Sequence, residues 1–203
     1  MKHNYGTVFP QLFPSLTWCK KSEAVHLTFD DGPIPEVTEW VLDLLSKEGI
    51  KATFFCVGDN IRKYPDLYQR LIDEGHSTGN HTFNHLNGRK VSSEEYFENI
   101  EKSESYMCDR DRSRLFRPPY GKLRYSQIRK LKKKYEVIMW DVLSGDFSQT
   151  LAPEDCLRAA LRYTKKGSIV VFHDNVKSFD TLQYVLPKYI KAIKEKGLTF
   201  SAL

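Results

Sequence analysis

The sequence predicts an α/β protein built on a parallel sheet, and two patterns in the chain support this prediction. Short apolar segments alternate with amphipathic segments along most of the 203 residues. Strands that alternate with helices imply parallel strands covered by helices. Polar clusters directly follow the apolar segments. The carboxyl ends of parallel strands meet at one edge of the sheet, so these clusters are expected to converge there and form an active site.

The first half of the chain supplies two predicted strands and three predicted helices. The apolar runs 25–29 and 52–57 are typical of buried strands, and the first is followed by a turn at Gly32-Pro33. Apolar residues at helical spacing predict a helix over 35–47. Further helices are predicted over 64–74, capped by Gly75, and from Ser92, whose sequence resembles a capping box, to about 108.

The second half continues the alternation. A short strand is predicted at 115–117, where two prolines end it. The remaining elements are helices at 125–134, 153–163 and 181–194, and strands at 135–142, 168–172 and 198–200.

Composition indicates one ordinary globular domain over residues 1–203, with 1–22 as an N-terminal extension. The net charge is +5, and the basic run 129–134 is interpreted as a solvated helix face because it lacks interleaved aromatics. We therefore expect no nucleic-acid partner.

The four cysteines form no CxxC pair, which argues against a cysteine zinc site. No signal peptide or transmembrane segment is visible, so the default expectation is a cytoplasmic location; oligomeric state is left open.

A metal site is predicted from two neighbouring acids and two histidines. Asp30 and Asp31 follow the first strand, and adjacent carboxylates need a cation or strong donors nearby. His81 and His85 are four positions apart, which would place both on one side of a helical turn. One carboxylate and two imidazoles leave an open coordination position, the arrangement of a hydrolytic metal. The other aspartate would then be free for proton transfer.

Other polar residues after strands are candidates for supporting roles. Arg117, before two prolines, is suited to hold a catalytic carboxylate ionised, and a backbone N–H near Tyr120 could face an oxyanion. His173 follows a very apolar strand and is a candidate general acid. Asp141 or Asp146 could orient a histidine.

Four segments in order resemble the motifs of polysaccharide deacetylases with the NodB homology domain, carbohydrate esterase family 4. They are Thr28–Pro33, His81–His85, Arg117–Gly121 and Val171–Asp174, and the resemblance runs from about Val25 to Leu203. It implies a distorted parallel (β/α) barrel of seven strands. It also implies one divalent metal, commonly zinc, with cobalt or nickel as alternatives.

The resemblance further implies a role for each matched residue. The metal ligands would be Asp31, His81 and His85, and the catalytic groups would be Asp30 as base, Arg117 as its tether, His173 as acid and Asp146 as the residue that tunes it. The Tyr120 backbone would bind the oxyanion, and Val171 would line the acetyl pocket, where the family usually has leucine. A second departure is the segment 143–147, in which Leu143 and Phe147 replace the usual aspartate and tryptophan.

The expected activity is metal-dependent hydrolysis of acetyl groups from N- or O-acetylated sugars of a glycan or oligosaccharide, a carbon–nitrogen bond hydrolysis in the N-acetyl case. Two alternatives remain at this point. An aspartate-based phosphohydrolase would favour an oxygen-rich Mg²⁺ site, whereas two histidines favour zinc-like metals. A non-catalytic glycan-binding domain would need neither a base nor an acid. The identity of the glycan is left open.

Overall fold

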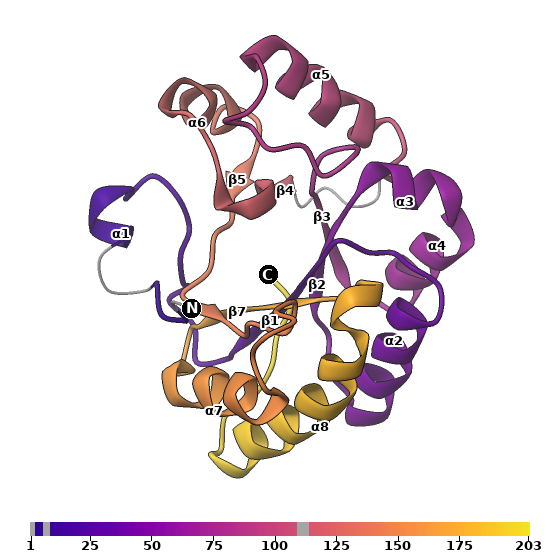
Figure 1. Ribbon diagram of the computed structural model, residues 1–203, viewed down its shortest axis with the longest axis vertical. Helices are drawn as coiled ribbons and strands as arrows, with labels where there is room; N and C mark the ends of the chain where they lie inside the picture. The colour runs from indigo at the N-terminus through magenta and orange to yellow at the C-terminus, as the bar shows by residue number, and fades with distance from the viewer. Residues whose placement is uncertain (1–2, 6–8, 109–113) are drawn as a thin grey trace.

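The computed structural model describes residues 3–5, 9–108 and 114–203. Its centre is a seven-stranded sheet in the order β5-β4-β3-β2-β1-β7-β6, and every strand pair in it is parallel. The sheet curls into a distorted half-barrel with the helices outside it (Figure 1), so the predicted fold class is confirmed. The strands are β1 His26–Asp30, β2 Thr53–Cys56, β3 Ser77–Asn80, β4 Leu115–Phe116, β5 Glu136–Val137, β6 Val142–Leu143 and β7 Ile169–His173.

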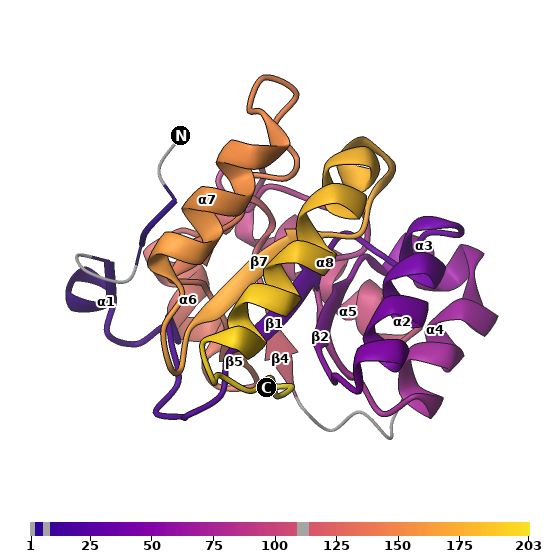
Figure 2. The same cartoon turned by 90° about the horizontal axis from the view of Figure 1, so that it is seen from below.

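Eight α-helices and two short 3₁₀ turns accompany the strands in the described residues. Figure 2 shows α7 and α8 lying across the outer side of β7 and β1, and α2 and α4 beside β2. The bounds are α1 Phe9–Leu12, α2 Val37–Glu48, α3 Gly58–Lys63, α4 Pro65–Asp73, α5 Ser93–Glu104, η1 Pro119–Gly121, α6 Tyr125–Leu131, α7 Pro153–Tyr163, η2 Val176–Ser178 and α8 Phe179–Glu195. No helix in the described part of the chain is both long and apolar enough to cross a membrane.

Alternation along the strands divides the core into two layers. Phe54 and Phe172 belong to a cluster beneath α2, α4, α7 and α8, whereas their neighbours Phe55 and Val171 belong to a second cluster, which also includes residues of α5 and α6. Successive strand residues point to opposite faces, so a strand buried on both sides reads as a continuous apolar run. The central strands are therefore packed on both faces, and this packing fixes the positions of the residues at their ends.

The N-terminal segment joins the two open edges of the sheet. The Tyr5 N–H donates to the Asp141 carbonyl (2.8 Å), and the Leu143 N–H donates to the His3 carbonyl (3.0 Å), so this segment pairs beside β6. The Thr17 N–H donates to the Val137 carbonyl (2.9 Å), which places Thr17 beside β5. What the sequence presents as an extension thus lies between β5 and β6.

Several predicted elements need correction. The strand expected over 135–142 is two short strands, β5 and β6, at opposite ends of the sheet order. Between them the chain changes partners: the Ile138 N–H donates to the Phe116 carbonyl at the end of β4 (2.8 Å), whereas the Asp141 N–H donates to the Ile169 carbonyl of β7 (3.3 Å). The Ile138 and Met139 carbonyls accept hydrogen bonds from the Arg117 guanidinium (3.4 and 3.1 Å). The strand expected at 198–200 is reduced to one bridge between Val25 and Phe200. Neither β3, which is polar, nor α3 was predicted.

Candidate active site

Polar side chains from five strands and their following loops meet at the carboxyl edge of the sheet, around a cavity of about 760 Å³. Its polar lining includes both aspartates after β1, both histidines after β3 and the histidine that ends β7, namely Asp30, Asp31, His81, His85 and His173. Asp30 and His173 are register partners in the β1–β7 pair, so sheet pairing itself places them side by side.

Three of these residues form a candidate metal centre. Asp31, His81 and His85 each offer a ligand atom, and these atoms lie within 4.8 Å of one another. Asp31 Oδ1 is 3.2 Å from His85 Nε2 and 3.7 Å from His81 Nε2. This oxygen is buried and has no hydrogen-bond partner among the described residues. A buried carboxylate oxygen facing two imidazole nitrogens is what a divalent cation would satisfy.

The outer nitrogens of both imidazoles are already engaged, which turns the Nε2 atoms toward Asp31. His81 Nδ1 lies 2.7 Å from the Arg117 carbonyl, an acceptor only, so Nδ1 carries the proton and Nε2 is left as a free base. His85 Nδ1 lies 3.2 Å from the Tyr120 hydroxyl. Burial lowers the pKa of His81 to about 4, which keeps the imidazole neutral. Neutral imidazoles fixed through Nδ1 are the form in which histidine binds metals.

The histidine loop differs from the predicted helical turn, and that expectation is wrong. Thr82 and His85 have positive φ values of 65° and 57°, which no helix permits. The loop is closed instead by side chains: Asn80 Oδ1 accepts from the Thr82 N–H (2.8 Å), and Thr82 Oγ1 accepts from the Leu86 N–H (3.0 Å). The two imidazole centroids nevertheless lie 5.1 Å apart.

Asn175 is a site residue that the sequence analysis did not identify. Its Nδ2 donates to Asp31 Oδ2 (2.6 Å), leaving Oδ1 for the metal position. The Asp31 backbone is held at φ 89°, a strained conformation, and its carbonyl accepts from Asn60 Nδ2 (2.8 Å). A lone asparagine two positions after His173 gives no pattern that could have indicated this contact.

One oxygen of the Asp30 carboxylate is bound by Arg117. Arg117 Nη1 donates to Asp30 Oδ1 (2.6 Å) and to Thr28 Oγ1 (2.8 Å). The guanidinium is fully buried and stacks over the Phe55 ring, with its Cζ 4.0 Å from the centroid. A guanidinium at this distance fixes the orientation of the carboxylate through a charge-assisted hydrogen bond.

His173 is held by Asp146 through two contacts. Its Nδ1 lies 2.8 Å from Asp146 Oδ1, and its backbone N–H donates to Asp146 Oδ2 (2.7 Å). Burial alone would lower the pKa of His173, but the Asp146 carboxylate outweighs burial and raises it to about 9. The imidazolium form is therefore favoured at neutral pH. Phe147, at the position where the family usually has tryptophan, packs edge-on against this ring at 4.9 Å.

Two other acids near the carboxyl edge, Asp141 and Asp174, serve the fold instead. Asp141 accepts from Ser168 Oγ and the Ile169 N–H (both 2.8 Å). Asp174 accepts from the Gly32 N–H (3.0 Å) and Thr38 Oγ1 (2.7 Å). Both carboxylates are thus engaged away from His173, so the described structure offers Asp146 as its partner.

The residues proposed for the acyl end of the cavity also line it. Tyr120 and Val171 line the cavity. Leu143 and Phe147, the two residues that differ from the usual family motif, line it as well. Tyr120 lies in the left-handed region at φ 59°, and its side chain is 60% exposed at the mouth. Its role in binding an oxyanion stays a prediction.

Comparison with known proteins agrees with this geometry. A family model described as polysaccharide deacetylase matches residues 18–140. A peptidoglycan-N-acetylglucosamine deacetylase of Bacillus cereus is 33% identical over 187 residues, covering 88% of this chain and 66% of that protein. A chitooligosaccharide deacetylase of Azorhizobium caulinodans is 33% identical over 206 residues, covering 91% of this chain and 94% of that one. The chain therefore spans slightly less than two thirds of the Bacillus cereus relative.

The fold is similar to that of a solved deacetylase. The crystal structure of the Bc1960 peptidoglycan N-acetylglucosamine deacetylase, in complex with an N-hydroxybenzamide, superimposes with a TM-score of 0.88 at 30% identity. The superposition covers 97% of this chain and 95% of that one. The likeness therefore includes the N-terminal segment as well as the strands that carry the site.

Proposed function

This chain belongs to the polysaccharide deacetylase family, and we propose that it removes the acetyl group from N-acetylglucosamine units of a glycan. The observation that carries this proposal is the meeting of an aspartate–arginine pair, a histidine–aspartate pair and a three-ligand metal centre around one cavity. The substrates named for the two relatives, peptidoglycan and chitooligosaccharides, share this acetylated sugar.

The metal centre fits a divalent ion held by Asp31, His81 and His85. When bound, such an ion supplies Lewis acidity toward the acetyl carbonyl and toward a water. Zinc is the metal that we propose, because one carboxylate and two imidazoles with an open position suit it. The described ligand set is not the oxygen-rich one that Mg²⁺ prefers, which argues against the phosphohydrolase alternative.

Two proton carriers stand in register on neighbouring strands. Asp30 is proposed as the base that takes a proton from the attacking water, and Arg117 keeps it ionised and oriented. His173 is proposed as the acid that gives a proton to the departing nitrogen, and Asp146 holds it protonated. Opposite protonation states of neighbouring groups at one pH are what acid–base hydrolysis requires. A binding module would need neither pair.

The experiment that tests the proposal is acetate release by zinc-reconstituted protein. N-acetylated and O-acetylated oligosaccharides are compared, with and without a chelator. We expect acetate from the N-acetylated substrate, loss of that activity with chelator, and recovery when zinc is restored. A purified, zinc-loaded protein that releases no acetate from any N-acetylglucosamine oligomer would contradict the proposal and favour the glycan-binding alternative.

A further inference from the structure

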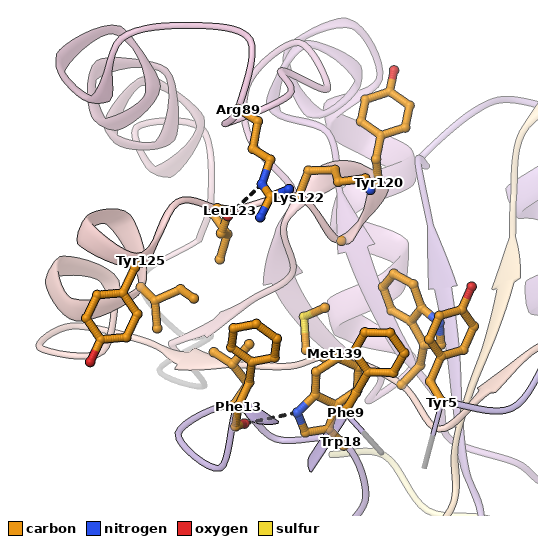
Figure 3. Close-up of a pocket in the computed structure, with 14 residues that line it drawn as sticks. Tyr5, Phe9, Phe13, Trp18, Arg89, Tyr120, Lys122, Leu123, Tyr125 and Met139 are labelled. Atoms are coloured by element: carbon orange, nitrogen blue, oxygen red, sulfur yellow. Dashed lines mark hydrogen bonds between the residues drawn. The ribbon is translucent and has the colours of Figure 1, made fainter. Parts of the chain in front are cut away.

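A second cavity of about 450 Å³ lies beside the active site and has no part in the chemistry proposed above. Figure 3 shows it enclosed by the N-terminal segment, the loop around Tyr120 to Tyr125 and Met139. We call it the aromatic pocket. Tyr5, Tyr120 and Trp140 line both this pocket and the active-site cavity, so the two spaces share a wall.

The N-terminal segment builds one side of the aromatic pocket. Phe9 packs on Trp18 with ring centroids 5.5 Å apart, and Tyr5 packs edge-on against Trp140 at 5.8 Å. Phe13 is 36% exposed at this side, and its carbonyl accepts from Trp18 Nε1 (3.2 Å). These contacts make a packed aromatic wall, held in place because the segment pairs with both sheet edges.

The opposite rim of the pocket is aromatic and cationic. Tyr125 lines the pocket there and is 73% exposed, so its ring is accessible to a ligand. Arg89 and Lys122 also line the pocket, whose described lining contains no acidic side chain. Neither cation forms an ion pair within residues 3–5, 9–108 and 114–203.

The wall between the two cavities contains the buried indole of Trp140. Trp140 is 9% exposed, and its indole Nε1–H has no hydrogen-bond partner in the part of the chain described here. Because this nitrogen has almost no accessible surface, it is part of the wall between the two cavities and is not offered to a ligand. The pocket thus combines apolar walls with two cations that form no ion pair among the described residues, and a hydrogen bond from Arg89 Nε to the Leu123 carbonyl (3.1 Å) holds one of them at the rim.

We propose that the aromatic pocket binds the sugar next to the one that is deacetylated, and that Arg89 and Lys122 contact a carboxylate on that neighbouring sugar. This inference rests on the proposed function, because the shared wall makes the pocket adjacent to the acetylated unit. A pyranose offers an apolar C–H face to aromatic rings and polar groups at its edge, which matches the lining. Charge complementarity selects an acidic sugar over a neutral one.

Two tetrasaccharides test the inference by activity. One contains only N-acetylglucosamine and is neutral; the other alternates N-acetylglucosamine with N-acetylmuramic acid, which carries a carboxylate. For the acidic substrate, the Arg89→Gln/Lys122→Gln double variant should raise KM about fivefold or more and leave kcat within about twofold. KM for the neutral substrate should stay unchanged. Lys133→Gln, which removes an exposed charge outside the lining, is the matched control.

The aromatic part of the inference has its own variant. Tyr125→Ala should raise KM for both tetrasaccharides, and Tyr125→Phe should restore it, because the ring face and not the hydroxyl makes the contact. Increasing ionic strength should raise KM for the acidic substrate alone, since it screens Arg89 and Lys122.

A binding measurement separates this inference from the proposed function. A disaccharide of N-acetylglucosamine and N-acetylmuramic acid is titrated into metal-free protein while tryptophan fluorescence is followed, because Trp18 and Trp140 line the pocket. We expect a saturable change that the double variant weakens. No saturable change, or equal KM values for the double variant and wild type on the acidic substrate, would overturn the inference and leave the deacetylase proposal standing. Absence of acetate release by wild type from both tetrasaccharides would instead contradict the deacetylase proposal.

Discussion

Arg117 Nη1 lies 2.6 Å from Asp30 Oδ1 in a place that water scarcely reaches, since the two side chains are 0% and 6% exposed. The backbone carbonyl of the same residue accepts a hydrogen bond from His81 Nδ1 (2.7 Å). Arg117 therefore links the proposed base to one proposed metal ligand. Replacing the side chain would remove the contact to Asp30 but would leave the carbonyl that binds His81.

Replacing Arg117 should destabilise the protein strongly. Arg117→Ala leaves the Asp30 carboxylate buried without its partner, which typically costs about 3–5 kcal/mol. Urea unfolding at neutral pH measures this loss. Arg62→Ala, which removes the exposed ion pair with Asp59, is the matched control and should cost about 0–1 kcal/mol. Equal losses in the two variants would show that the Arg117–Asp30 pair is not the stabilising contact that its burial indicates.

Replacing a proposed ligand should remove metal binding. His81→Ala should weaken zinc affinity by about 100-fold or more, because it deletes a donor and not merely a residue that supports one. Isothermal titration of metal-free protein with zinc measures the change. Asn84→Ala, an exposed change in the same loop, should leave affinity unchanged. Full zinc occupancy in His81→Ala would refute the assignment.

Asn175 should matter to the metal although it is not a proposed ligand. Asn175→Ala releases Asp31 Oδ2, so the carboxylate can rotate away from the two imidazoles. Residues that orient a ligand typically contribute about 10–100-fold to metal affinity. Zinc titration is the readout, and thermal unfolding checks the cap that Asn175 also makes to Ser178. An unchanged affinity with an intact fold would mean that Asp31 is oriented by other contacts.

Asp30→Asn should separate chemistry from metal binding. The amide keeps the shape of the side chain but cannot take a proton, so we expect turnover to fall about 10²–10⁴-fold with zinc retained. Acetate release and metal content are measured on the same preparation. Near-normal turnover would identify a base other than Asp30.

The rate should fall at high pH as His173 loses its proton. Burial would lower the pKa of His173, but Asp146 raises it to about 9, so the acid form persists through neutral pH and disappears above that value. Asp146→Asn should move the alkaline limb to lower pH. A folded-state pKa above the unfolded value also means that this pair stabilises the protein at lower pH and loses its contribution as pH rises through about 9. An alkaline limb that stays in place in Asp146→Asn would exclude Asp146 as the residue that tunes His173.

The sequence by itself determined the strand–helix alternation, the parallel sheet and the residues that gather at its carboxyl edge. These features depend on local patterns: apolar runs such as 25–29 form buried strands, and the end of a parallel strand always faces the same edge. The motifs therefore indicated Asp31, His81 and His85 together, even though the loop between the histidines is not the helical turn that their spacing suggested.

Only the tertiary structure decided which contacts each side chain makes. β3 is polar and was not predicted, because its stability comes from pairing with β2 and β4 and not from an apolar pattern. The strand expected over 135–142 divides into β5 and β6, because its first part pairs with β4 and its last part pairs with β7, at opposite ends of the sheet order. The positions of the N-terminal segment and of Asn175 could not be predicted from the sequence. Their partners lie more than a hundred residues away, and a contact at that separation leaves no local pattern in the sequence.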